Sequence, residues 1–579
     1  MIFRRKMMIR KSALIIPALM MIAALSAQEA LKSAEEEYYD YLSLTGVTER
    51  PALGYRTLSD STWLFGDVTS FEENDDGTFT RTSVPGAESA RHIWRDNNLG
   101  SRYVLWESGS PSENWFVRGL NQNITLRIYG PDWFNSINTA APYGQNDGAL
   151  WQGKGYNTSL SAGARLEAYG FELTLRPQLS FSQNLAFEHL PGVYGNEYSY
   201  FTSSGGYIDL VQRYGDSAFW NFDWGDTEAR WTWRNITVGF GTQNPWLGPA
   251  YLNPMLGSNN APSYPKLDFG LRKTRIIIPG LGWNLGTIEG RVWVGKLSQS
   301  DYFSSDYPYD TMINALSASY APSFIPGLTI GLNRIFLNRW DMKNLLYFGR
   351  LFTFSRKNDT EGDGDDQKIS IFADWMFPKI GFEFYFEYGF DDFSTNRWSN
   401  TFHTGIYTVG VKQDIPIKSD KLRSEFNFEV NFFEMSQDFQ LEWCYGGFYT
   451  HGKVANGYTN KGQILGAGSG SFGNSQFIQY KLYYPKGSTS VFFHRYCPNI
   501  NFIYNKAVYA NASAGSAIWD EFYSIYETYF AVGLKSEYFV TDSLLLSGGG
   551  DLIVQIHKMY QRDNNNVMFS LNFGLKYNF

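Results

Sequence analysis

The sequence predicts an all-β membrane protein: an antiparallel transmembrane β-barrel of about 18 strands, preceded by a short periplasmic helical segment. Three observations carry this prediction: an N-terminal export signal, a high aromatic content, and strands in which apolar and polar residues alternate. After residue 27 no apolar run is long enough for a spanning helix. Only helices and closed barrels satisfy all their backbone groups in lipid, so a barrel remains.

The first 27 residues have the layout of a secretory signal peptide. A basic stretch ends at Lys11, a short apolar run extends from Ala13 to Leu25, and Leu25-Ser26-Ala27 is a small-residue cleavage site before Gln28. The alternative is a membrane anchor helix, but such a helix needs about 20 apolar residues. We therefore expect export, followed by insertion into a bacterial outer membrane.

Composition supports a barrel and excludes one class of partner. Aromatic residues make up 18% of the 579 residues, charged residues also make up 18%, and the formal net charge is −8. In a barrel, apolar residues face lipid, polar residues face the lumen, and aromatic residues collect at the interfaces. Nucleic acid is not an expected partner, because its phosphates require clusters of Lys and Arg.

The C-terminal segment has the clearest strand pattern. From Val567 to Phe579 every second residue is apolar, and the residues between are mostly polar or glycine. This run exceeds the about 9–11 residues that cross a bilayer, whereas strands of soluble proteins are mostly about 5–6 residues long. Phe579, with Tyr577 two residues before it, resembles the signal that the barrel-assembly machinery recognises. We expect that machinery and outer-membrane lipid as partners.

The alternation recurs along the chain, and the connections differ in length. Tight connections suit the periplasmic side of a barrel, and long polar connections suit the exterior. Alternating segments are found at 124–128, 160–168, 171–181, 369–377, 382–390 and 426–432, with tight turns at 169–170, 234–235, 378–381 and 541–543, and long loops at 182–224, 298–311, 357–367 and 446–476.

Residues 28–114 lack this alternation. Apolar residues between Glu29 and Leu44 recur at helical spacing, and Gly46 ends the pattern. We expect a signal peptide over 1–27, a periplasmic helical segment with lead-in strands over 28–114, and the barrel over 115–579.

Several charged residues fall on the predicted lumenal faces. They could form a mutually neutralising ladder that stiffens the barrel, or a binding wall for an anionic or hydroxyl-rich ligand, since arginine offers a planar fork to carboxylates. The candidates are Arg165, Arg176, Arg230, Glu289 and Arg291, accompanied by Glu167 and Glu172.

Catalytic and metal motifs were not found. The six histidines lack zinc-ligand spacing, no nucleophile elbow is present, and no cofactor is expected. The acidic stretch 359–366 could hold calcium, but it lacks the full calcium-loop pattern and is better explained as a solvated loop. Cys444 and Cys497 could form a disulfide or remain reduced.

One stretch resembles a known family. Residues 229–267 contain Trp246, Gly248 and Pro249, followed by the segment 258–262, which is Ser258, Asn259, Asn260, Ala261 and Pro262. This combination resembles the signature of the Wzi capsule-assembly family of outer-membrane proteins, with Leu247 where the family often has a second Trp. Weaker similarity extends over about residues 36 to 340.

The resemblance implies an 18-stranded barrel that acts as a non-enzymatic, lectin-like holder of capsular or other surface polysaccharide. It assigns no sugar contacts, so Trp246 could serve packing or stack on a sugar. Aromatic residues of the predicted loops are permissive for sugar binding. These include Trp133, Tyr143, Trp151, Tyr194, Tyr198 and Trp220.

Two alternatives remain from the sequence. An outer-membrane channel for small polar solutes is compatible with the lumenal charges, since a barrel of about 18 strands is wide enough for water. An outer-membrane enzyme would need a Ser/His or paired-carboxylate constellation, and only His189 and scattered acidic residues are available.

Overall fold

The computed structural model describes the chain from residue 33 onward, with gaps. The expected signal peptide, Cys444 and most of the acidic stretch 359–366 lie outside the described residues. The described ranges are 33–58, 62–73, 79–99, 104–109, 112–192, 196–200, 207–353, 365–391, 405–433, 447–498 and 525–579.

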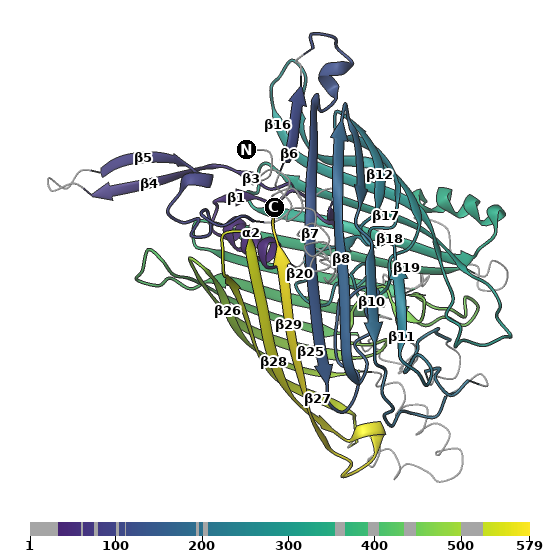
Figure 1. Cartoon of the computed structure of the whole chain (residues 1–579). Helices are drawn as coiled ribbons and strands as arrows, with labels where there is room; N and C mark the ends of the chain where they lie inside the picture. The colour runs from purple at the N-terminus through teal and green to yellow at the C-terminus, as the bar shows by residue number, and fades with distance from the viewer. Residues whose placement is uncertain are drawn as a thin grey trace, which may run out of the picture.

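Eighteen antiparallel strands form one closed barrel, which confirms the predicted fold class and strand number (Figure 1). Two of the strands are each interrupted once and therefore carry two labels. The strands are β7 (Asn123–Asn138), β8 (Gly155–Ala168), β9 (Phe171–Leu175) with β10 (Gln178–Ser182), β11 (Phe219–Asp223) with β12 (Glu228–Trp233), β13 (Ile236–Gly241), β15 (Lys266–Ile277), β16 (Asn284–Leu297), β17 (Thr311–Pro322), β18 (Leu328–Arg339), β19 (Asp366–Phe377), β20 (Phe382–Asp391), β21 (Gly405–Asp414), β22 (Arg423–Phe432), β25 (Asn474–Tyr484), β26 (Gly487–Cys497), β27 (Thr528–Phe539), β28 (Leu544–Ile556) and β29 (Asn566–Tyr577).

The last strand closes the barrel against the first. β29 pairs antiparallel with β7, with Leu571 opposite Ile137. A short strand, β6 (Val104–Gly109), pairs with the part of β7 that extends beyond β29. Closure leaves no long unpaired edge in lipid, which is the condition for a strand protein to cross a membrane.

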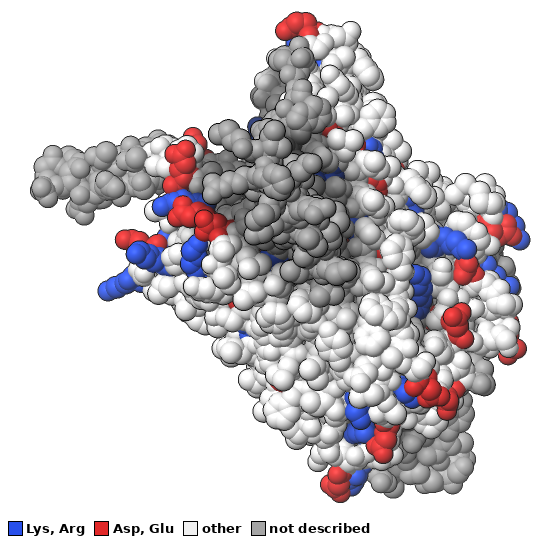
Figure 2. Space-filling view, viewed as in Figure 1, with Lys and Arg blue, Asp and Glu red and all other residues white. Residues whose placement is uncertain are grey.

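The alternation of the sequence sets the two faces of the wall. On β29, Phe569 and Leu571 are 51% and 54% exposed, whereas Met568 and Ser570 are buried against the lumen. The tight turn predicted at 378–381 joins β19 to β20, which pair with Ile369 opposite Phe390. Most of the wall in Figure 2 carries no charged side chain, and charges gather toward its margins.

Short turns gather at one end of the barrel, here called the helix end, and long loops at the other, the loop end. The β8–β9 turn consists of Tyr169 and Gly170, with φ of 48° and 81°. The β12–β13 turn consists of Arg234 and Asn235, with φ of 47° and 69°. Two left-handed residues in succession make the tight turn whose twist matches antiparallel strands.

An N-terminal helix, α2 (Ala34–Leu44), confirms the helical pattern for the residues that the structure describes; 29–32 lie outside them. Ser33 caps the helix by accepting a hydrogen bond from Glu36 N. Gly46, with φ of 74°, follows the C-cap and ends it. Within the described part of the chain, no helix is both long and apolar enough to cross a membrane.

The smaller elements surround this helix or connect barrel strands. A hairpin of β4 and β5 projects away from the barrel wall near α2 (Figure 1). The bounds are β1 (Thr48–Glu49), β2 (Tyr55–Arg56), β3 (Leu64–Phe65), β4 (Asp67–Glu73), β5 (Phe79–Pro85), β14 (Trp246–Leu247), β23 (Thr459–Asn460) and β24 (Gln463–Ile464), with 3-10 helices at Gly86–Glu88, Val117–Gly119, Met342–Phe352 and Lys558–Tyr560.

Helix α2 packs into the helix end of the barrel. Its carboxylates meet lysines on the inward faces of the strands: Glu37 lies 2.6 Å from Lys481, and Asp40 lies 2.5 Å from Lys412. The Tyr41 ring stacks on Tyr483 with centroids 4.9 Å apart. These ion pairs and the stacked rings therefore fix the position of α2 inside the barrel.

The largest hydrophobic core lies inside the barrel and is built mainly from loops. Residues of the β13–β15 and β22–β25 connections pack with β2 and with the wall. Leu247, Met255, Tyr449 and Tyr458 are each at most 1% exposed. Apolar side chains thus point into the lumen where loops fill it, which is unlike a water-filled channel.

Candidate functional site

The family motif begins with a strand that lies inside the barrel. β14 pairs antiparallel with β2, with Leu247 opposite Tyr55. Gly248 N donates to Gly54 O at 2.9 Å, and Gly248 has φ of 81°, a conformation that favours glycine. The motif therefore joins the N-terminal segment to the β13–β15 loop.

Trp246 serves packing in this arrangement. Its ring is 4% exposed and its Nε1 donates to Ala250 O at 3.0 Å across the turn that Pro249 begins. A buried indole whose nitrogen is bonded within its own loop is typical of a packing role. Of the two roles that the sequence left open for Trp246, the geometry favours the structural one.

Glu429 of β22 anchors the next part of the loop. Its carboxylate accepts hydrogen bonds from the backbone nitrogens of Tyr251, Leu252 and Asn253, at 2.6, 3.1 and 2.9 Å. Glu289 of β16 does the same for Leu53 and Gly54 N, each at 2.8 Å. Wall carboxylates therefore satisfy buried backbone donors that no strand or helix partner reaches.

The second half of the motif connects two long loops. Ser258 Oγ donates to Gly466 O at 2.6 Å, and Asn260 Nδ2 donates to Ile464 O at 3.0 Å. Asn259 O accepts from Gly148 N at 2.6 Å. Ala261 and Pro262 offer their carbonyl oxygens to Asn244 and Asn460. These hydrogen bonds fix the relative positions of the loops that meet inside the barrel.

The lumenal arginines are paired with carboxylates. Arg165 lies 2.7 Å from Glu167 and 2.6 Å from Glu172. Arg230 and Arg291 share Asp268, at 2.6 and 2.8 Å. All three guanidinium groups are buried.

Arg176 completes this pattern, at 3.2 Å from Asp226 and 3.3 Å from Asp132. None of these four arginines, nor Glu289, lines the cavity at the loop end of the barrel. The geometry favours the neutralising ladder over an anion-binding wall.

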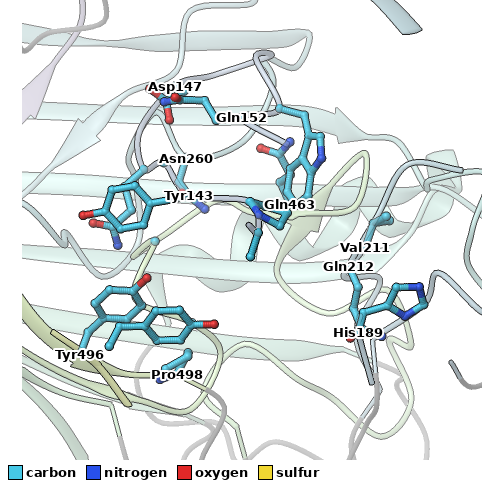
Figure 3. A pocket seen from close by; sticks show the side chains of 18 of the residues that line it. Tyr143, Asp147, Gln152, His189, Val211, Gln212, Asn260, Gln463, Tyr496 and Pro498 are labelled. Carbon is cyan, nitrogen blue, oxygen red and sulfur yellow. The ribbon is translucent and has the colours of Figure 1, made fainter. Parts of the chain in front are cut away.

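A cavity of about 530 Å³ lies inside the loop end and is here called the outer cavity. Its size is within the range of about 300–1,000 Å³ typical of small-ligand sites. Its walls come from the loops after β7, β10 and β24 and from the loop-end halves of β26, β27, β28 and β29. Figure 3 shows Asp147 and Gln152 above Tyr143 and Asn260, with Tyr496 and Pro498 below them.

Aromatic rings form part of this wall. Tyr496 and Tyr529 stack with centroids 4.7 Å apart and planes 5° from parallel. Tyr496 also stacks with His494, with ring centroids 4.8 Å apart. Trp151 meets Tyr214 edge-on at 5.1 Å. Rigid rings of this kind offer apolar faces beside polar edges.

Carboxyl groups from the loops complete the outer cavity. Burial raises the pKa of Asp147 to about 7, although a hydrogen bond with Gln152 opposes the shift. Burial also raises the pKa of Glu527, which accepts bonds from Tyr529 Oη and Gln555 Nε2, each at 2.6 Å. The outer cavity can therefore accept hydrogen bonds from a hydroxyl-rich ligand.

The sequence anticipated part of this set. Tyr143 and Trp151 were among the predicted loop aromatics, and His189 also lines the cavity, as does Asn260 of the motif. Trp133 and Trp220 lie on barrel strands, outside the cavity lining, and Tyr194 lies outside the described residues. Tyr496, Tyr529 and Glu527 were missed. The two tyrosines occupy inward-facing positions of β26 and β27, so the alternation of residues along these strands would have indicated them.

The remaining sequence hypotheses concern cysteine and metal. The thiol of Cys497 donates to Glu527 O at 3.1 Å, and its possible disulfide partner Cys444 lies outside the described residues. Of the acidic stretch, Asp365 and Asp366 are described, and they pair with Arg350 and Lys368. Among the described residues, no cluster of His, Cys, Asp and Glu could hold a metal ion.

A closed barrel with an apolar outer wall and a lumen filled by its own loops defines a plugged outer-membrane barrel protein. The model of the family named capsule assembly protein Wzi matches residues 136–491, more than half of the chain, so the chain belongs to this family. This confirms the resemblance drawn from the 229–267 motif and extends it beyond residue 340. The protein is therefore located in the outer membrane.

Solved structures show the same fold at low sequence identity. The chain is similar to Escherichia coli Wzi, described as an outer-membrane, carbohydrate-binding β-barrel involved in group 1 capsule assembly. Identity is 13%, coverage is 85% of this chain and 98% of that one, and the TM-score is 0.50.

Two porin-like barrels show a more distant likeness. Pseudomonas putida OprB is 12% identical, with coverage of 79% and 94% and a TM-score of 0.35. Acinetobacter baumannii OccAB4 is 10% identical, with coverage of 77% and 96% and a TM-score of 0.35. No curated protein matches the chain in sequence.

Proposed function

We propose that this protein binds surface polysaccharide in the outer cavity and thereby retains it on the cell exterior. The observation that carries the proposal is the outer cavity itself, in which stacked tyrosines, Trp151 and several carboxyl and amide groups surround about 530 Å³. Sugar rings present apolar faces that pack on aromatic rings and hydroxyl groups that bond to such polar side chains. The family membership and the carbohydrate binding described for Escherichia coli Wzi support the same role.

This role requires no chemistry at the site. We propose that the protein acts as an anchor without catalysis, because the outer cavity is built for hydrogen bonding and stacking. In this proposal the loop end faces the exterior and the helix end faces the periplasm, as short turns and long loops do in related barrels.

Two partners follow from the wall. The exposed apolar side chains of the strands would contact outer-membrane lipid. Tyr577 and Phe579 lie on the outer face, 39% and 42% exposed, with ring centroids 5.0 Å apart. We propose that the barrel-assembly machinery recognises this aromatic end.

The test measures attachment and binding together. A strain lacking the protein should still make surface polysaccharide but release it into the medium. In complementation, Tyr143→Ala combined with Trp151→Ala should fail to restore attachment, and the purified variant should lose binding to the isolated polysaccharide. Trp340→Ala, at the loop end but outside the outer cavity, is the matched control. Unchanged attachment in the deletion strain would contradict the proposal.

A further inference from the structure

The charges that line the outer cavity are unbalanced. Four carboxyl groups line it, from Asp147, Glu188, Glu527 and Asp551, against one lysine, Lys558. Lys558 Nζ is already paired, 2.7 Å from Glu188 Oε2. Within the described part of the chain, the other three carboxyl groups form no ion pair. This differs from the lumenal ladder deeper in the barrel, where each arginine is matched by carboxylates.

Three buried polar atoms in the cavity wall lack a protein hydrogen-bond partner among the described residues. They are the hydroxyl of Tyr200, whose side chain is 4% exposed, the Nε1 of Trp151, and the Oε1 of Gln555, which is 3% exposed. Buried polar groups are nearly always bonded, so such atoms around one cavity indicate a ligand or water that completes them. Together they comprise a donor, an acceptor and a hydroxyl that can act as either.

A sugar unit fits this mixture of groups. Each sugar hydroxyl both donates and accepts, so it can bond equally to the donors and the acceptors of such a wall. At a pH at which Asp147 and Asp551 are ionised, an added carboxylate on the sugar would meet them while Lys558 is already paired with Glu188. Like charges brought together without compensation weaken binding strongly. An ammonium group would instead find acceptors on those residues.

We propose that the sugar unit held in the outer cavity carries no negative charge and donates hydrogen bonds, from hydroxyl or ammonium groups, to Asp147 and Asp551. This inference rests on the proposed function and specifies its ligand class. A polysaccharide with acidic units can still be held, provided that a non-acidic unit enters the cavity.

The experiment compares oligosaccharides that differ at one position. Galactose, galactosamine and galacturonic acid oligomers of equal length are titrated into the purified protein in detergent near pH 8, where Asp147 is ionised, beside the isolated surface polysaccharide. The galactose or galactosamine oligomer should bind at least about tenfold more tightly than the galacturonic acid oligomer. A preference for galactosamine would assign ammonium as the donor, and equal binding of the two would assign hydroxyl.

Variants separate the possible outcomes. Asp147→Asn combined with Asp551→Asn should improve binding of the galacturonic acid oligomer toward that of galactose, whereas the exposed control Asp341→Asn should not. Tighter binding of the acidic oligomer to the unmodified protein, lost in Trp151→Ala, would overturn the inference and leave the proposed function standing. If neither the polysaccharide nor any oligomer binds, both fail.

Discussion

Arg50, in the segment that follows α2, forms a two-pronged ion pair with Glu383 of β20: Nη2 lies 2.6 Å and Nη1 3.0 Å from the carboxylate oxygens. The Glu383 side chain is fully buried, and Arg50 also reaches Asp40 and Asp374, at 2.8 and 2.9 Å. One guanidinium thus connects the N-terminal helix, its following segment and two neighbouring wall strands. These ion pairs join the N-terminal segment inside the barrel to the barrel wall. The segment that fills the barrel therefore contributes to the stability of the folded protein.

We expect Glu383→Gln to destabilise the protein by about 2 kcal/mol, because it weakens two charge-assisted hydrogen bonds to a guanidinium that keeps Asp40 and Asp374 as partners. The measurement is the urea midpoint in detergent, converted with the slope of the unmodified protein. Asp341→Asn, which removes an exposed carboxylate paired with Lys343, is the control and should leave the midpoint unchanged. Equal midpoints for both variants would show that Arg50 does not hold the N-terminal segment.

The filled lumen predicts low ion conductance. The unmodified protein should be nearly silent in a planar bilayer, although an open barrel of 18 strands is wide enough for water. Deleting residues 33–57, which contain α2 and β2, should raise the conductance. A control deletion removes the projecting hairpin, residues 67–85, whose flanking Gly66 O and Gly86 N are already hydrogen-bonded at 2.7 Å. Porin-like conductance of the unmodified protein would restore the channel hypothesis.

The wall could be predicted from sequence because its signal is local. A strand buried on one side and facing lipid on the other repeats every second residue, so the faces of β19, β20 and β29 follow from the sequence alone. Pairing then follows from the short turn between strands, as for Ile369 and Phe390.

The interior could not be predicted in this way. Glu429 accepts from Tyr251 N, and Glu289 accepts from Leu53 N, across separations of well over a hundred residues. No period in the sequence encodes such contacts. The role of the arginine candidates depends on their partners: Arg291 and Arg230 both pair with Asp268, which no sequence pattern indicates.

Gly410 of β21 lies against Tyr385, so that a Cβ at this position would overlap the tyrosine ring. The Tyr385 hydroxyl donates to Glu429 Oε2 at 2.8 Å, and Glu429 in turn holds the motif loop at Tyr251. We expect Gly410→Ala to displace the ring and to destabilise the protein by about 1–3 kcal/mol, as overpacking does elsewhere.

The measurement for Gly410→Ala is again the urea midpoint, together with polysaccharide affinity. Gly349→Ala is the matched control, because a Cβ there meets no atom within 4 Å. A loss of stability in Gly410→Ala accompanied by weaker polysaccharide binding would connect the wall to the outer cavity through Glu429 and the motif. Equal midpoints for the two variants would show that the site tolerates the extra methyl group.

The buried carboxyl group of Asp147 makes the stability of the folded protein decrease as the pH rises. Burial raises its pKa from 3.8 in the unfolded chain to about 7, so the folded protein favours the neutral carboxyl. The contribution of Asp147 to the free energy of unfolding is fully present below its pKa in the unfolded chain. It is lost as the pH rises through its pKa in the folded protein.

Asp147→Asn keeps the shape but cannot ionise. The variant should therefore match the unmodified protein near pH 4 and unfold at a higher temperature near pH 8. Tryptophan fluorescence during heating in detergent measures this difference across the range, with the exposed Asp306→Asn as control. A difference that stays constant with pH would mean that Asp147 ionises in the folded protein as it does in water, and that the outer cavity is more hydrated than its walls suggest.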